Sequence, residues 1–188
     1  SWPEVQTNES RLTAPLCIAG GIAKQIPARR GIHTGAHLAS VGALCDEPFP
    51  LVPTKELFDQ LSAKAFPVID EQKGQKMENL IAEAAAEADS IGGIIEGAAI
   101  GLPAGLGSPI FSGMENRLAT AIFGIPAVKG LEFGAGFGSV LRRGSQNNDP
   151  CFVDQDGRVR TKTNNSGGIL GGITSGMPLL FRAAIKPT

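Results

Sequence analysis

The chain has few residues of the kinds that build disulfide frameworks or metal sites. It contains three cysteines and two histidines among 188 residues. Cys17, Cys45 and Cys151 lie far apart with no CxxC spacing, and such an odd, sparse set predicts free thiols in a reducing compartment. His33 and His37 are the only histidines, and the closely spaced ligands that a metal site needs are missing. We therefore expect neither disulfides nor a metal.

Aromatic residues, net charge and long apolar runs are also scarce. Nine Phe, one Trp and no Tyr imply that aliphatic side chains fill most of the core. Seventeen Lys and Arg balance eighteen Asp and Glu, for a net charge of −1, so no basic field favours nucleic acid as a partner. No apolar run approaches the roughly 18–20 residues of a membrane span, and residues 1–7 carry no signal-peptide pattern. We expect a cytoplasmic protein with no membrane partner.

Glycine, by contrast, is abundant, with 25 of 188 residues against a typical share of about 7%. This abundance predicts many tight turns or close backbone contacts. With 42% hydrophobic and 19% charged residues, a chain of this length can bury one good core. We expect an irregular arm over residues 1–9 and a single domain over residues 10–188.

Apolar residues at helical spacing predict four helices, over residues 10–26, 54–65, 70–88 and 113–123. Ser10, Thr54 and Asp70 are the expected N-caps of the first three. Small residues cover so much of the first helix that we expect it to be buried between other layers.

Apolar segments between turn residues predict strands over residues 31–44, 90–102, 128–133, 158–163 and 177–185. The turn at residues 154–157 is expected to form a hairpin, and residues 142–149 a polar loop. Glu96, inside an apolar strand, either points to solvent or is paired. Helices mixed with antiparallel-looking strands favour an α+β fold.

The segment from Asn164 to Gly176 stands out for its paired glycines and is followed by a strand that ends on Lys186. Paired glycines let the backbone approach a flat or charged ligand, and their exposed N–H groups suit an anion or a ring oxygen. A tight structural turn accounts for the same residues. Asn164 and Asn165 either bond a ligand or occupy left-handed turn positions.

A group of basic residues precedes this segment and has two interpretations. These residues either steer an anionic substrate or protect the edge of a sheet. They are Arg142, Arg143, Arg158, Arg160 and Lys162.

The exact order of residues is more specific than the glycine content. Residues 163–176 read TNNSGGILGGITSG and, with the Lys-Pro-Thr at 186–188, closely resemble a segment of chorismate synthase. Four further segments resemble this family and occur in its order: residues 11–16 with 23–25, residues 101–107, residues 125–134 and residues 143–149. The resemblance covers residues 10–188.

The resemblance implies a β-α-β sandwich, with antiparallel sheets packed on central helices, and a homotetramer. It implies 1,4-anti elimination of phosphate from 5-enolpyruvylshikimate 3-phosphate to give chorismate, with reduced FMN as cofactor and NADPH as the source of reductant in some members. It places the following residues at the cofactor: Arg11, Pro126, Ala127, Gly171, Lys186, Pro187 and Thr188. The chemistry agrees for Gly171, which admits a ring or a phosphate, and for Lys186, which offers a compact positive charge.

The acid and base motifs of the family are absent from the chain. They are Gly-Glu-Ser-His, Arg-Pro-Gly-His and Arg-His-Asp-Pro, and the residues before Arg11 also depart from the family pattern. Catalytic and substrate-binding residues therefore stay unassigned, since a strand histidine such as His33 or His37 is more often structural. Because proton transfer contributes about 10²–10⁴-fold to a rate, we expect little turnover from this chain alone. Two alternatives stay open: a non-catalytic flavin- or phosphate-binding module and an oligomer-forming fragment.

Overall fold

The computed structural model describes residues 2–187, with side chains from residue 13 onward. Its helices and strands are α1 (Trp2–Ala28), β1 (His33–Val41), β2 (Leu44–Cys45), α2 (Lys55–Ala63), α3 (Glu71–Ala86), β3 (Gly93–Ile100), η1 (Ile110–Ser112), α4 (Met114–Phe123), β4 (Val128–Phe133), η2 (Gly136–Leu141), α5 (Gly144–Asn147), β5 (Cys151–Val153), β6 (Val159–Thr161), β7 (Ile169–Leu170), β8 (Ile173–Thr174) and β9 (Leu179–Ile185).

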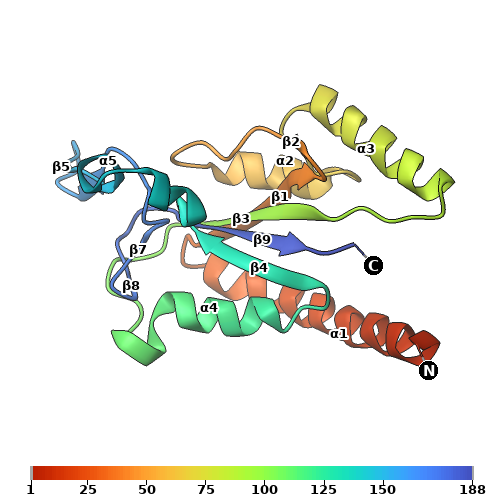
Figure 1. The fold of residues 1–188 in the computed structure, drawn as a ribbon. Coiled ribbons are helices and arrows are strands. Elements are labelled where there is room, and N and C mark those ends of the chain that lie inside the picture. Colours follow the sequence, from red (N-terminus) through yellow and green to blue (C-terminus); the bar gives the residue numbers. More distant parts are fainter. Residues whose placement is uncertain (1, 188) are drawn as a thin grey trace.

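One antiparallel sheet organises the chain. Its five strands lie in the order β2-β1-β3-β9-β4, and each is antiparallel to its neighbours. Helices α2 and α3 lie on one side of the sheet, and α1 and α4 on the other (Figure 1). The expected α+β class, with an antiparallel sheet packed on helices, is therefore confirmed. The strands β5–β6 and β7–β8 form two separate hairpins.

Two capped helices build the core on one face of the sheet. The Thr54 hydroxyl accepts a hydrogen bond from the Leu57 N–H at 3.2 Å, and the Asp70 carboxylate accepts one from the Gln72 N–H at 2.8 Å. Both predicted N-caps are thus confirmed, and each fixes the start of its helix. The buried side chains beneath them are Val41, Phe49, Phe58, Leu61, Val68, Met77 and Ala98. On the opposite face, α4 packs on β4 and β9 through Ile122, Val128 and Ala183.

Helix α1 differs from both expectations for this part of the chain. It begins at Trp2, so the irregular arm expected over residues 1–9 is wrong for residues 2–9, and Ser10 lies inside the helix. The physical reason is that no glycine interrupts these residues and Pro3 lies in the first turn, where its missing N–H costs little. The expected burial is also wrong for the side chains described from Thr13 onward. Residues 14–26 are all exposed, Thr13 is half-buried, and Pro27 and Ala28 are half-buried near β1 at the end of the helix.

Other elements differ in detail. The expected strand over residues 31–44 is two strands, because β2 turns back on β1 and pairs Cys45 with Ser40. The hairpin around residues 154–157 is confirmed as β5–β6. The expected polar loop contains the short helix α5, and the glycine-rich segment contains the β7–β8 hairpin.

Three further properties of the described residues concern disulfides, membrane spans and metal sites. All three cysteines are exposed free thiols. No helix within residues 2–187 is long and apolar enough to cross a membrane. In the same part of the chain, no three His, Cys, Asp or Glu side chains are grouped to hold a metal ion.

Candidate functional site

Four of the predicted cofactor residues lie together where β9 ends. Lys186 and Pro187 follow β9, and Pro126 and Ala127 precede β4. Because β4 and β9 pair antiparallel, the start of one strand adjoins the end of the other. The Lys186 N–H donates a hydrogen bond to the Ala127 carbonyl at 3.0 Å. The sheet therefore joins two segments that lie far apart in the sequence. We call these four residues the β9-end site.

The backbone of the β9-end site is irregular. Ala127 has a φ of +66°, in the left-handed region that costs a residue with a Cβ about 1–2 kcal/mol. Directly after it, the register between β4 and β9 shifts between Val128 and Gly130, which marks a β-bulge. Bulges and strained residues of this kind concentrate at functional sites, where they re-aim the backbone. The geometry thus singles out the residues that the sequence motif singles out.

The β9-end site carries an available positive charge. Among the described residues, the exposed Lys186 Nζ donates only to the Pro187 carbonyl, at 3.2 Å. Within residues 13–187, no carboxylate oxygen lies within ion-pair distance of it. An ammonium group without a carboxylate partner is free to bind a phosphate or an electron-rich ring oxygen. The residues present therefore fit an anionic cofactor.

Gly171 lies elsewhere. It forms the β7–β8 turn with Gly172, whose carbonyl accepts a hydrogen bond from the Met114 N–H at 2.8 Å. This bond places the turn at the first residue of α4, whereas Pro126 and Ala127 come after the last residue of that helix. A ten-residue helix spans about 15 Å, so Gly171 and the β9-end site lie at opposite ends of α4. Gly171 is nevertheless open to a ligand, because a Cβ there would meet no atom within 4 Å.

The first glycine pair of the segment has a structural role. Gly167 and Gly168 are buried and have φ values of +64° and +77°. A side chain on Gly167 would collide with the backbone of Gly134, and one on Gly168 with the Pro178 carbonyl. The turn interpretation is therefore confirmed for this pair.

Asp149 holds the same segment from outside. Its carboxylate accepts hydrogen bonds from the Thr163 hydroxyl at 2.6 Å, the Asn165 N–H at 2.8 Å, and the Ser166 N–H and hydroxyl at 2.9 and 2.8 Å. Burial acts to raise the pKa of Asp149, but the hydrogen bonds from Thr163, Ser166 and Asn165 outweigh it and lower the pKa below its ordinary value. Asp149 therefore works as an ionised anchor for residues 163–166.

The remaining candidates are placed as follows. The side chain of Arg11 and the whole of Thr188 lie outside the described residues. Asn164 supports the turn, because its side chain donates to the Pro178 carbonyl and accepts from the Gly168 N–H, both at 2.8 Å. In the basic group, the Arg142 guanidinium donates to the Asn165 side-chain oxygen.

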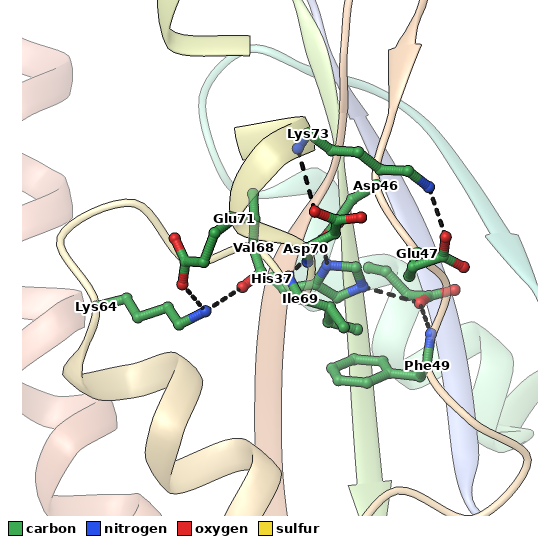
Figure 2. Close-up of polar contacts among 11 residues, drawn as sticks. His37, Asp46, Glu47, Phe49, Lys64, Val68, Ile69, Asp70, Glu71 and Lys73 are labelled. Atoms are coloured by element: carbon green, nitrogen blue, oxygen red, sulfur yellow. Dashed lines mark hydrogen bonds and ion pairs between the residues drawn. The ribbon is translucent and has the colours of Figure 1, made fainter. Parts of the chain in front are cut away.

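Sequence reasoning missed a polar cluster in the core. His37 is 1% exposed and lies between the carboxylates of Asp46 and Glu96 (Figure 2). Of the two alternatives for Glu96, exposure to solvent or pairing, the structure shows pairing. His37 is a buried residue of the core, which agrees with the expectation that a strand histidine is structural. The sequence feature that could have revealed this cluster is the pairing of polar residues across strands. His37, Glu96 and Arg182 lie opposite one another on β1, β3 and β9.

Comparison with known proteins gives one consistent answer. The family model described as chorismate synthase matches residues 2–188. A chorismate synthase of Lancefieldella parvula is 44% identical over 95% of this chain and 50% of its own length. One of Thermococcus gammatolerans is 47% identical over 95% of this chain and 48% of its own length. A solved chorismate synthase structure aligns with a TM-score of 0.81 and 29% identity, over 89% of this chain and 53% of its own. The chain thus spans about half the length of these relatives.

Proposed function

Because this chain belongs to the chorismate synthase family, we propose that the protein carrying it eliminates phosphate from 5-enolpyruvylshikimate 3-phosphate to give chorismate. It is then a carbon–oxygen lyase of the shikimate pathway, which supplies aromatic amino-acid biosynthesis. The observation that supports a cofactor role is the hydrogen bond at 3.0 Å between the Lys186 N–H and the Ala127 carbonyl. It holds a cation, which has no carboxylate partner in residues 13–187, beside a strained backbone turn where the family motif expects the cofactor.

Reduced FMN is the proposed cofactor, and the chemistry it supplies when bound is transient electron donation that helps the allylic phosphate to leave. The chain's own part is to bind and orient. Lys186 offers its ammonium group to a negatively charged or electron-rich group, and the exposed ring of Pro187 provides an apolar surface next to it. Ala127 fixes the backbone on the other side. NADPH as the source of the reductant is part of the same proposal.

Assembly into a homo-oligomer, a tetramer by resemblance, is proposed from the surface of α1. Ile18, Ile22 and Ile26 follow at four-residue spacing and are 67%, 63% and 63% exposed. Large apolar side chains gathered on one stripe are typical of a surface that other protein covers. Sedimentation at several concentrations tests this, and a monomer at all of them contradicts it. A cytoplasmic location is likewise proposed.

Anaerobic titration with reduced FMN tests the cofactor site. Lys186→Ala removes the unpaired ammonium group and should weaken binding by about 10-fold or more, since hydrogen bonds to charged groups contribute about 1.5–3 kcal/mol. Lys129→Ala is the matched control, because Lys129 is an exposed cation on the adjoining β4 and changes the net charge equally. Equal weakening by the two variants would mean that only the overall charge matters.

An assay of chorismate formation separates the proposal from its alternatives. Turnover in the protein carrying this chain supports the enzyme. Flavin binding without turnover supports the non-catalytic binding module, and multimers without flavin binding support the oligomer-forming fragment. For the 188 residues alone we expect little turnover, because the family's acid and base motifs are absent from them.

A further inference from the structure

The polar cluster at the centre of the sheet is a row of three ionisable side chains. The His37 Nδ1 lies 3.1 Å from the Asp46 Oδ2, and the His37 Nε2 lies 3.0 Å from the Glu96 Oε2 (Figure 2). The side chains of His37 and Asp46 are fully buried, and that of Glu96 is 4% exposed. Both ring nitrogens can donate hydrogen bonds at once only when the ring carries both protons. Two hydrogen bonds among one imidazole ring and two carboxyl groups need two protons, which leaves one negative charge on the row whichever atoms carry them.

The two ends of the row differ in how their oxygens are satisfied. Asp46 accepts hydrogen bonds at both oxygens, from the Ile69 N–H at 2.6 Å and the Asp70 N–H at 2.9 Å. In Glu96, by contrast, Oε2 takes both bonds, from His37 and from the Phe49 N–H at 2.8 Å. Oε1 of Glu96 has no donor among the described residues, and it is not among their sealed, unpartnered polar atoms. Oε1 of Glu96 is therefore the oxygen of the row that can accept a hydrogen bond from a ligand.

Glu96 is also part of the wall of a cavity. Glu96 lines a cavity of about 400 Å³ between the 48–53 loop, the segment after β4 and the start of β9. Its wall is about half apolar, from the prolines of the 48–53 loop and from Pro178 and Leu180, and about half polar. Two guanidinium groups, of Arg142 and Arg182, line the same cavity. A volume of this size, with apolar surface beside a few polar groups, is typical of small-molecule sites.

Both arginines have N–H donors without an acceptor among the described residues. Arg182 uses Nη2 to bind the Glu132 carboxylate at 2.8 Å and, at 3.4 Å, the Gly134 carbonyl. Arg142 uses Nη1 to bind the side chain of Asn165. A guanidinium has five N–H donors in a fork that matches a carboxylate. Among the described residues, the cavity thus offers a carboxylate oxygen without a donor, guanidinium N–H groups without an acceptor, and apolar surface between them.

We propose that this cavity binds a small zwitterion, a molecule with an ammonium group, a carboxylate and an apolar body. The ammonium group binds the Glu96 Oε1, where it neutralises the charge of the buried row. The carboxylate binds Arg142 and Arg182, and the apolar body packs on the prolines. This site is distinct from the β9-end site, because it lies beside the start of β9 and not its end, and it does not depend on the proposed reaction.

Calorimetric titration of the protein carrying this chain with three related molecules tests the proposal. L-Leucine has all three parts, 4-methylpentanoate lacks the ammonium group, and 3-methylbutylamine lacks the carboxylate. Leucine should bind at least tenfold more tightly than either, since each charge-assisted hydrogen bond contributes separately. Equal binding of leucine and 4-methylpentanoate, or no binding of any of the three, would overturn the proposal.

Two variants assign the roles. Glu96→Gln should weaken the binding of leucine at least tenfold and leave the binding of 4-methylpentanoate unchanged. Arg142→Gln changes an exposed residue and therefore spares the core. It should weaken the binding of leucine and of 4-methylpentanoate and leave the binding of 3-methylbutylamine unchanged. Arg117→Gln, an exposed arginine on α4 across the sheet, is the matched control and should change nothing. If Glu96→Gln does not fold, the three-molecule comparison and Arg142→Gln still decide, and unchanged leucine binding by Arg142→Gln refutes the site.

Discussion

Replacing Asp149 with Asn should loosen the glycine-rich segment while leaving the main sheet intact. Asp149 accepts four hydrogen bonds, two at each carboxylate oxygen, from Thr163, Asn165 and Ser166. The amide of Asn keeps one oxygen and turns a nitrogen, itself a donor, toward the other two donors. A half-buried donor left without an acceptor costs about 1–3 kcal/mol. We therefore expect a loss of about 2 kcal/mol in the free energy of unfolding at pH 7.

The same contacts set the pH dependence of this loss. The pKa of Asp149 is lowered in the folded state, since hydrogen bonds from Thr163, Ser166 and Asn165 outweigh the burial that acts to raise it. The folded state therefore binds the proton less readily than the unfolded state does. The stabilisation is fully present above the ordinary pKa of about 3.9 and is lost as the pH falls through the lower, folded value. Asn does not titrate, so the difference in stability between wild type and variant should shrink below about pH 4.

Urea denaturation at pH 7 and in a series below pH 4 measures this difference, and hydrogen exchange of the amides of residues 163–168 localises it. Asp156→Asn is the matched control, because the exposed Asp156 carboxylate makes no hydrogen bond with the described residues. A loss below about 0.5 kcal/mol, the scale of an ordinary surface substitution, would refute the anchoring role of Asp149. A difference that grows as the pH falls would refute the stated cause of its lowered pKa.

Three further substitutions test the core, each by urea denaturation. His37→Ala leaves two buried carboxylates without their shared partner and should cost about 3–5 kcal/mol of stability. The control His33→Ala, at a ring with no hydrogen bond among the described residues, should cost about 1 kcal/mol. Equal costs would show that the contacts of His37 with Asp46 and Glu96 add no stability. Met77→Ala opens a cavity at a fully buried side chain and should cost about 2–5 kcal/mol, and a smaller loss would mean that α3 packs loosely. Gly35→Ala pushes a methyl group into the Phe58 ring and should cost about 1–3 kcal/mol; Phe58→Leu in the same chain should recover part of that loss, and no recovery would exclude this collision as its cause.

The sequence predicted elements whose signals are local. Thr54 and Asp70 precede apolar residues at helical spacing, and each caps its helix as expected. The β5–β6 hairpin follows from the turn residues 154–157, because a turn between two short strands fixes their pairing. In these cases the residues that decide the structure lie within one or two turns of each other.

Burial was less predictable, because it depends on what lies opposite. Ile81 belongs to the same apolar stripe of α3 as Met77, yet Ile81 is 39% exposed and Met77 is 0% exposed. The stripe gives the direction in which a side chain points but not the extent of the surface facing it. The same reason explains α1, whose small residues suggested burial and whose side chains from residue 14 to 26 are exposed.

The site was predictable in part. Residues at the β9-end site were identified by resemblance, and strand pairing brings Ala127 to Lys186. The sequence did not show that Gly171 lies a helix length away from the β9-end site, since a motif gives the order of residues but not their distances in the fold. The row from Asp46 to Glu96 was missed for a related reason. A histidine and a glutamate in different strands become partners only once the register sets them opposite each other.

The glycine-rich segment therefore serves two purposes, and they follow from where its glycines lie. Gly167 and Gly168 are buried against Gly134 and Pro178, so any side chain there would force apart the turn that leads into β9. Gly171 has open space around it and touches nothing that a Cβ would displace. A methyl group at Gly168 should thus destabilise the fold, whereas one at Gly171 meets only the cost of its left-handed φ of +60°, about 1–2 kcal/mol. If Gly171→Ala also weakens the binding of reduced FMN, then FMN contacts this turn, either by extending along α4 from Lys186 or from the site of a second copy of the chain.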